Sequence, residues 1–517
     1  MEKVMVIPRF RDLNLAFVVT GFLLVATMIL VVRYQIYLMN YMEWGDESET
    51  VVIAKLLASG LSLYSEVFSQ HGPLVYLPGL LVEKVSDATI STHRISIACL
   101  QLLALLALYC SPLIKSRTVG NSYVMLAATI MVVYISAYFG HMYLYHSVAG
   151  LMVVIILAQL TLPAIVVPEK LTLRHVVLGN VLIGALPFLA VTYLPAAILL
   201  FIASSRSPFL IAAWLSLIGA LLANFAYLTV IGSIPGFLAI HLYLNLFVYA
   251  AMPHTGMGGP EAILLSIFAI FSYDFSGFLL LLAFVFAMIA LAMNEGRLPW
   301  RTFALALAVG SLTVRGASFW GVPFYYAMLA LPLIFAFHAP VFRGKALVYI
   351  CLAAAICFAK LSLMLPYDAQ RFQARKIRET TEFAQIVQRL TAPDDRIIAY
   401  SFNNFEYLAA KRLPASGSIY YLPHQEFYNE EPVLGITVTA CRDIAQYQPK
   451  VMLIDKWNAW NRYPWGTYGQ CVQEVLDAGY TQIENKPYYV RTDILLAHLG
   501  VPSLAAGQAA TVDDILR

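Results

Sequence analysis

Charged residues are scarce in this chain of 517 residues: they make up 12% of it, whereas 60% of the residues are hydrophobic. The mean hydropathy of +0.73 is too high for a water-soluble domain of this length. Apolar runs of about 18 residues or more recur through positions 1–365, and a run of that length can span the hydrocarbon core of a bilayer. The composition therefore predicts a polytopic helical membrane protein.

Basic clusters and metal-binding cysteine patterns are also absent. The net charge is +3, no block of Lys and Arg suggests nucleic-acid binding, and the six cysteines have no spacing typical of a zinc site. The amino terminus lacks the short apolar core and the small-residue cleavage site of a cleaved signal peptide. Lys3, Arg9 and Arg11 precede an apolar run over 13–32, which predicts an uncleaved first transmembrane helix with its amino end in the cytoplasm.

The apolar runs predict about eleven spans. The fifth and sixth contain Pro187 and Pro195, and they form either two full crossings or one broken re-entrant hairpin. The expected positions are 13–34, 91–113, 121–138, 147–167, 176–191, 193–204, 209–231, 262–292, 302–318, 320–338 and 345–365.

Short basic connections between these spans indicate the topology. Every second connection carries Lys or Arg, which marks the cytoplasmic side. The other connections, 35–90, 139–146 and 232–261, are rich in Tyr, His, Trp and Gly and are expected outside, with the carboxyl-terminal part. The basic connections hold Lys115, Arg117, Lys170, Arg174, Arg206, Arg297, Arg301, Arg343 and Lys345.

The composition changes at Pro366, where charged residues become frequent. Helical patterns at 375–390, 405–412 and 470–478 alternate with strand patterns at 396–400, 451–455 and 488–490, which predicts a small α/β domain with a partly parallel sheet. The expected organisation is a transmembrane catalytic domain over 1–365, an extracytoplasmic α/β domain over 366–496, and a disordered tail over 497–517.

The cysteines divide between these two parts. Cys99, Cys110, Cys351 and Cys357 fall inside predicted spans and are expected to pack. Cys441 and Cys471 fall in the predicted extracytoplasmic domain, an oxidising space. We therefore hypothesise a Cys441–Cys471 disulfide.

Ionisable residues gather in the external loop 35–90. Asp46 and Glu47 are adjacent and Glu49 follows. One interpretation is a helix N-cap, with Asp46 or Ser48 capping a helix that begins near Glu49. The other is a functional carboxylate at the membrane interface, because Tyr41, Met42 and Trp44 precede it.

The residues after these acids have helical spacing. Val52, Ile53, Leu56 and Leu57 share one face, and Gly60 suits the end of a helix. The pattern predicts a helix in the plane of the membrane surface. A turn at 70–73 then leads back to the second span, which would bring His71 close to the carboxylates.

These motifs carry a resemblance to a known family. Gly45-Asp46-Glu47, the amphipathic helix and His71-Gly72-Pro73-Leu74 resemble the GT-C glycosyltransferases. The branch with bacterial aminoarabinose transferases and protein O-mannosyltransferase-like enzymes is the most similar. The resemblance extends over the span layout and the carboxyl-terminal domain, where Pro414-Ala415 precedes aromatic residues.

The resemblance implies transfer of a sugar from a polyprenyl-phosphate donor to a glycan, lipid or protein hydroxyl, with inversion, at the outer face of a bacterial inner membrane. Asp46 matches the catalytic base, and Glu47 is expected to shape the site or bind the acceptor. The leaving phosphate needs cationic partners. The aminoarabinose-transferase motif has Lys where this chain has His71, so we expect either a protonated His71 or help from Arg94 or Arg315. Interfacial snorkelling is the other interpretation of both arginines.

Three further residues are candidates for binding the sugar or the acceptor. Tyr145 and His146 lie in the short external loop, where an aromatic belt explains them equally well. Tyr243 lies in the 232–261 segment, which either gates entry or merely connects two spans. No cofactor is indicated, and the histidines of 141–146 have no nearby carboxylate to complete a metal site.

Two other classes of function stay open. A secondary transporter is disfavoured because the sequence has no internal inverted repeat and no ionisable residue deep in several spans. A non-catalytic protein of envelope polysaccharide assembly would not need Asp46. The sequence does not identify the sugar, the acceptor, the metal dependence or the oligomeric state.

Overall fold

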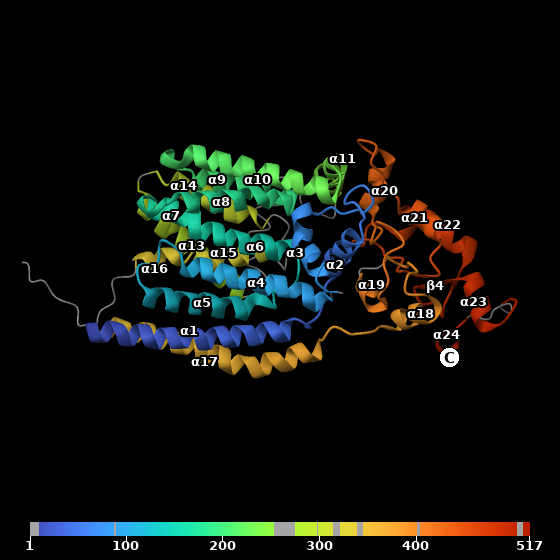
Figure 1. Ribbon diagram of the computed structural model, residues 1–517, viewed down its shortest axis with the longest axis horizontal. Coiled ribbons are helices and arrows are strands. Elements are labelled where there is room, and N and C mark those ends of the chain that lie inside the picture. Colours follow the sequence, from blue (N-terminus) through green and yellow to red (C-terminus); the bar gives the residue numbers. More distant parts are fainter. Residues whose placement is uncertain are drawn as a thin grey trace, which may run out of the picture.

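A computed structural model describes residues 10–86, 89–252, 275–296, 298–313, 321–338, 345–400, 404–503 and 510–517. Figure 1 shows a bundle of long helices with a smaller carboxyl-terminal part at one end, so the molecule is elongated along the bundle axis. Helices α2 (Gly45–Ala58) and α3 (Leu77–Glu83) lie between the two parts. The junction between the bundle and the carboxyl-terminal part therefore contains the polar loop identified in the sequence.

The bundle is that of a polytopic membrane protein. Six described stretches are long and apolar enough to cross a bilayer: Leu15–Leu38, Ile90–Tyr109, Arg117–Ile135, Tyr145–Val166, Ser207–Ile231 and Leu352–Ala374. They belong to helices α1 (Phe10–Leu38), α4 (Ile90–Tyr109), α5 (Arg117–Ile135), α6 (Tyr145–Ile156) with its extension to Val166, α10 (Leu210–Ile231) and α17 (Lys345–Ala374).

Shorter helices complete the bundle. They are α7 (Leu162–Val166), α8 (Leu173–Ala185), α9 (Leu194–Ser204), α13 (Phe275–Glu295), α14 (Trp300–Ser311), α15 (Val322–Ala330) and α16 (Leu333–His338). Helix α15 packs against α6, and α8 packs against α10. The stretch 145–166 is buried almost throughout because it lies among these neighbours. Side chains such as Phe22 and Ile211 on α1 and α10 are exposed, as expected for surfaces that face lipid.

Three predictions about element boundaries were wrong. Residues 234–249 form a short helix, α11 (Ile234–Gly236), and a π-helix, η7 (Phe237–Tyr249), instead of an external loop, because this segment is apolar and packs beside Tyr64 and Phe188. Helix α17 continues through Pro366 to Ala374, beyond the expected domain boundary. Helix α23 (Thr492–Leu499) ends inside the expected tail, and α24 (Val512–Leu516) lies within that tail, with Val512 and Ile515 buried.

The carboxyl-terminal part contains a four-stranded sheet in the order β1-β2-β4-β3. Strands β1 (Ile398–Tyr400) and β2 (Val451–Ile454) are parallel, whereas β4 (Tyr488–Arg491) is antiparallel to both β2 and β3 (Tyr480–Gln482). The partly parallel sheet predicted from the sequence is thus confirmed. The surrounding helices are α18 (Glu382–Leu390), α19 (Phe405–Ala410), α20 (Pro423–Glu430), α21 (Ala440–Tyr447), α22 (Gln470–Gly479), α23 and α24.

A disulfide joins two of these helices. Cys441 of α21 and Cys471 of α22 are bonded, with Cα atoms 6.1 Å apart, which is the pairing hypothesised from the sequence. The predicted helix over 375–390 begins later, at Glu382. The residues before it run along the end of α1 instead.

Backbone hydrogen bonds hold the two parts together at the junction. Met42 donates its N–H to the carbonyl of Arg375 and Ile377 donates to that of Asn40, both at 2.8 Å. On the other edge, Phe68 donates to the carbonyl of Gly417 at 3.0 Å. These bonds fix the carboxyl-terminal part against the loop between α1 and α4.

The backbone of Gly417 packs closely on the backbone of Glu66. We expect Gly417→Ala to loosen the junction between the two parts. A Cβ at position 417 would lie 1.7 Å from the carbonyl oxygen of Glu66, so the two backbones must separate. We expect a lower unfolding temperature and faster proteolysis at the junction. Gly479→Ala is the control, because nothing lies within 4 Å of its added Cβ. Equal unfolding temperatures for both variants would contradict the prediction.

Candidate active site

Helix α2 (Gly45–Ala58) carries the carboxylates identified in the sequence. The helix begins earlier than predicted, with Trp44 at the N-cap position and no side-chain cap. Asp46 and Glu47 instead occupy its first turn, where the helix dipole favours negative charge. The capping interpretation of Asp46 and Ser48 was therefore wrong.

Helix α2 was predicted as an amphipathic helix in the plane of the membrane surface, but protein surrounds it on all sides. It packs against α3 (Leu77–Glu83), α4 and α19. Its polar residues Glu47, Ser48 and Glu49 are as buried as the apolar Val52 and Ile53. Asp46 keeps partial exposure, whereas Glu47 and Glu49 are buried.

A buried ion pair fixes the first turn of α2. Arg94 donates from Nε to Glu47 Oε1 at 2.8 Å and from Nη2 to Oε2 at 2.5 Å. Its remaining N–H groups donate to the carbonyls of Leu38, Tyr41 and Met42 at 2.6–2.7 Å. Glu47 also accepts the N–H of Tyr143 at 2.8 Å. This network ties α1, α2 and α4 together.

The same network contradicts the predicted role of Arg94 in binding the donor phosphate. Its side chain is 1% exposed, and its donors already bind Glu47 and the three carbonyls. Glu47 is completely buried and is bound to Arg94. Arg315, the alternative arginine, lies outside the described residues.

A cavity of about 280 Å³ opens between the start of α2 and the carboxyl-terminal part. Asp46, Glu49 and His71 line it on the bundle side. Asn404 lines it as well and donates from Nδ2 to the carbonyl of Gly45 at 3.3 Å, which connects α19 to the start of α2. The juxtaposition of the acids with His71, predicted from the loop sequence, is confirmed.

His71 is positioned from several sides. Its Nε2 lies 3.8 Å from Glu49 Oε2, and its carbonyl accepts the hydroxyl of Tyr64 at 2.6 Å. The preceding carbonyl of Gln70 accepts from Asn245 Nδ2 at 2.7 Å and lies 3.0 Å from His241 Nδ1. The π-helix η7 thus holds the turn that presents His71.

Tyr145 and His146 lie behind this turn. The ring of Tyr145 packs on that of His71 with centroids 4.4 Å apart, and His146 Nδ1 lies 2.9 Å from the hydroxyl of Tyr193. Both residues are buried and neither lines the cavity. Tyr243 packs on Phe247 and does not line the cavity either. Their geometry indicates support of His71 by Tyr145, not direct contact with sugar or acceptor.

Aromatic residues of the carboxyl-terminal part form the opposite wall. They were not predicted as site residues, although the aromatic run after Pro414 and the acid at the end of strand 451–455 were visible in the sequence. Asp455 follows β2 directly, at the carboxyl end of a parallel strand pair, where ligand sites commonly occur. The wall consists of Tyr400, Tyr420, Tyr421, His424, Asp455, Trp457, Trp460 and Tyr468.

Tyr420 connects this wall to the acids of α2. Its hydroxyl donates to Glu49 Oε1 at 3.3 Å. Burial, and then the nearby charges of Glu49 and Asp46, raise the pKa of Tyr420 well above its ordinary value. The phenol therefore remains a neutral hydrogen-bond donor at physiological pH.

The described residues contain no group of three or more His, Cys, Asp or Glu side chains arranged to hold a metal ion. Asp46, Glu49 and His71 thus present two acids and one imidazole at the cavity without forming such a group.

The sequence matches no protein-family model and no curated protein. Among solved structures it is similar to ArnT from Cupriavidus metallidurans bound to undecaprenyl phosphate, with 12% identity, a TM-score of 0.51, and coverage of 76% of this chain and 85% of that one. The archaeal oligosaccharyltransferase AglB from Archaeoglobus fulgidus, in complex with an inhibitory peptide and a dolichol-phosphate, also matches. It has 12% identity, a TM-score of 0.43, and coverage of 86% and 72%. The chain has the GT-C fold, as the sequence predicted.

Proposed function

We propose that this protein is a membrane glycosyltransferase that moves a sugar from a polyprenyl-phosphate donor to an acceptor hydroxyl, with Asp46 as the catalytic base. The observation that carries the proposal is the placement of a partly exposed carboxylate, Asp46, on a cavity that also presents His71 and an aromatic wall. The GT-C fold, shared with a protein whose structure contains undecaprenyl phosphate, supports this class of donor.

The chemistry assigned to Asp46 is proton removal. As the acceptor oxygen attacks the anomeric carbon, its proton passes to the carboxylate of Asp46. The bond from that carbon to the phosphate oxygen breaks on the opposite face, and the electron pair leaves with the polyprenyl phosphate. Attack opposite the leaving group inverts the configuration, and a positioned base accelerates such a step by about 10²–10⁴-fold.

The leaving phosphate develops negative charge that needs a nearby partner. His71 and His424 are the two histidines that line the described part of the cavity, and His71 is the one on the bundle side, beside Glu49. Nε2 of His71 faces the carboxylate of Glu49 at 3.8 Å. We assign His71 to the donor phosphate, with Tyr145 stacked behind it.

The aromatic wall fits a sugar. Sugar rings have apolar faces that pack on Trp and Tyr, while their hydroxyls bind to acids and amides. Trp457, Trp460 and Tyr421 supply the rings, and Asp455 and Asn404 supply the polar groups. A cavity of about 280 Å³ is at the lower end of the range for small-molecule sites, which suits one or two sugar units.

The orientation and the domain roles are part of the same proposal. We place the amino terminus in the cytoplasm and the junction at the outer face of an inner membrane, following the basic connections along the sequence. The bundle over 1–365 then holds the donor lipid, and the α/β part that follows closes the site from outside. The Cys441–Cys471 disulfide suits an oxidising compartment.

The test combines reconstitution with a cellular assay. The purified protein in lipid nanodiscs is incubated with a set of polyprenyl-phosphate sugars and with envelope glycan acceptors, and release of polyprenyl phosphate is measured. In parallel, envelope glycans from cells with and without the protein are compared by mass spectrometry. We expect one sugar to be missing from the glycans of cells that lack the protein. An unchanged profile together with no turnover would refute the proposal.

Replacement of His71 tests its role at the phosphate. We expect His71→Lys to retain most activity, because an ammonium group supplies the positive charge, and His71→Ala to lower kcat/KM by about 10- to 100-fold. The loss should appear with every polyprenyl-phosphate donor tested. His175→Ala is the control, since His175 caps α8 far from the cavity lining. Equal activity of His71→Ala and the wild type would remove His71 from the site.

A further inference from the structure

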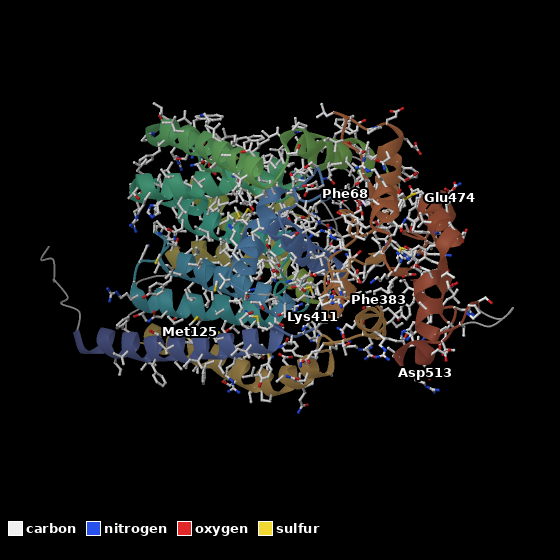
Figure 2. All side chains as sticks on the ribbon, turned by 45° about the vertical axis from the view of Figure 1, so that its right-hand side comes forward. Phe68, Met125, Phe383, Lys411, Glu474 and Asp513 are labelled. Carbon is white, nitrogen blue, oxygen red and sulfur yellow. A yellow bond between two sulfur atoms is a disulfide. The ribbon has the colours of Figure 1, made fainter. Side chains whose placement is uncertain are left out.

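A second and larger cavity, of about 1080 Å³, lies at the same junction. It shares no lining residue with the candidate active site. Its walls come from Lys55 of α2, from the segment 376–380 that follows α17, and from Lys411 and Arg412 after α19. We refer to it as the basic groove. Figure 2 shows Lys411 where the helical bundle meets the carboxyl-terminal part.

The charge of the basic groove is strongly positive. Five basic side chains line it, Lys55, Lys376, Arg378, Lys411 and Arg412, against two acids, Glu83 and Glu379. Both acids already pair with bases: Glu83 lies 3.1 Å from Lys55 and 3.2 Å from His93, and Glu379 lies 3.2 Å from Lys376. Among the described lining residues, no carboxylate is left to offset the remaining three charges.

Arg412 is held in place by neutral groups. Its Nε donates to Thr391 Oγ1 at 3.0 Å, and Nη2 donates to the Thr391 carbonyl at 3.1 Å. These bonds order the guanidinium, and the carboxylate of Asp395, which does not line the groove, interacts with it electrostatically. Lys411 next to it has φ of +54° at the end of α19, in the left-handed region where glycine is favoured. The chain thus places a long cationic side chain where a glycine would be less strained.

The groove also has apolar and uncharged polar lining residues, and it lies at the level where spans end. Val52, Ile90, Phe405 and Leu408 line it beside the basic residues. Asn40, just after α1, and Ile90, the first residue of α4, belong to its wall, and both helices are candidate membrane spans. The groove therefore offers cationic and apolar surface together, next to the bilayer surface. An amphiphilic anion matches both.

We propose that the basic groove binds the phosphate head group of an anionic membrane lipid, at a site separate from the sugar-transfer cavity. The phosphate contacts Arg378, Lys411 and Arg412, and the glycerol and upper acyl carbons lie on the apolar wall. The proposed lipid site is independent of the proposed sugar transfer at Asp46, because different residues form the two sites.

Native mass spectrometry of the full chain in mild detergent tests the site. The protein is titrated with phosphatidylglycerol or with zwitterionic phosphatidylcholine, and the first bound lipid is quantified. We expect selective retention of phosphatidylglycerol. The double variant Lys411→Glu with Arg378→Glu should weaken it by at least about 30-fold, since each basic residue at a membrane surface contributes about fivefold. The control is Arg442→Glu with Arg462→Glu, two exposed residues that line neither cavity.

Each outcome decides the proposal. Equal retention of the two lipids, unchanged binding in the groove variant, or an equal loss in the control variant would overturn it. A separate arm adds inorganic phosphate at millimolar concentration: displacement of the lipid by phosphate would identify a site for free anions instead. Unfolding temperatures establish that each variant is folded. If the charge reversals fail to fold, Lys411→Gln with Arg378→Gln gives the same test with a smaller expected loss.

Discussion

Asp46→Asn should lower the rate of sugar transfer by about 10²–10⁴-fold, the range typical for loss of a positioned base. The amide keeps the shape of the carboxylate but cannot accept the proton of the acceptor hydroxyl. Asp46 is partly exposed at the start of α2, and an amide of the same shape fits there without repacking. We expect the variant to unfold at the temperature of the wild type. The measurement is release of polyprenyl phosphate by the purified protein, with expression and unfolding followed in parallel.

Two comparisons isolate the role of Asp46. Asp477→Asn, on the exposed face of α22, controls for the loss of one negative charge and should leave turnover unchanged. Glu49 lines the same cavity, but Glu49→Gln removes the carboxylate beside His71. We therefore expect Glu49→Gln to raise KM for the polyprenyl-phosphate donor, whereas Asp46→Asn lowers the rate of transfer. If Asp46→Asn retained wild-type turnover, another group would be the base, or the protein would be a transporter or an assembly factor.

Sequence reasoning located the bundle side of the site because its signals are local. Asp46, Glu47 and His71 lie within 26 positions of one another, and one loop between two apolar runs must bring them together. The strands 398–400 and 451–454 were also visible, because short apolar runs between polar segments are typical of buried strands. The fold class followed from hydropathy, which depends on composition more than on contacts.

The parts that sequence reasoning missed depend on long-range contacts. The aromatic wall joins residues 400–468 to a loop near position 46, and no local pattern encodes which aromatic side chains face that loop. Residues 234–249 were interpreted as a loop because they contain polar and aromatic residues. Their π-helical form follows from packing on the turn at Gln70. The change in composition at Pro366 predicts that the last span ends there, but α17 continues through Pro366 to Ala374.

Arg94 illustrates the same limit for a single residue. An arginine at the mouth of a predicted span is equally consistent with phosphate binding and with a structural ion pair. The choice depends on whether a carboxylate lies within reach. Glu47 is 47 positions away along the chain, and only the folded arrangement of α2 beside α4 brings it to Arg94. The structure therefore changes the expected consequence of replacing Arg94 from weaker substrate binding to lost stability.

Arg94→Leu should destabilise the protein by about 3–5 kcal/mol, since removal of one partner leaves a buried charge without compensation. Glu47 is completely buried, and the carbonyls of Leu38 and Tyr41 would lose their donor as well. The free energy of unfolding in detergent is the measured quantity. Arg491→Ala is the matched control. It breaks an exposed pair with Asp493 and should cost at most about 1 kcal/mol.

A double variant distinguishes the structural role from a role in phosphate binding. Glu47→Leu with Arg94→Leu removes both charges, so it should be less destabilised than Arg94→Leu alone. If Arg94 bound the donor phosphate instead, Arg94→Lys would raise KM for the donor without a loss of stability, and the added Glu47 substitution would restore nothing. Recovery of stability in the double variant would establish that Arg94 acts through Glu47, to hold the first turn of α2 and therefore Asp46 at the cavity.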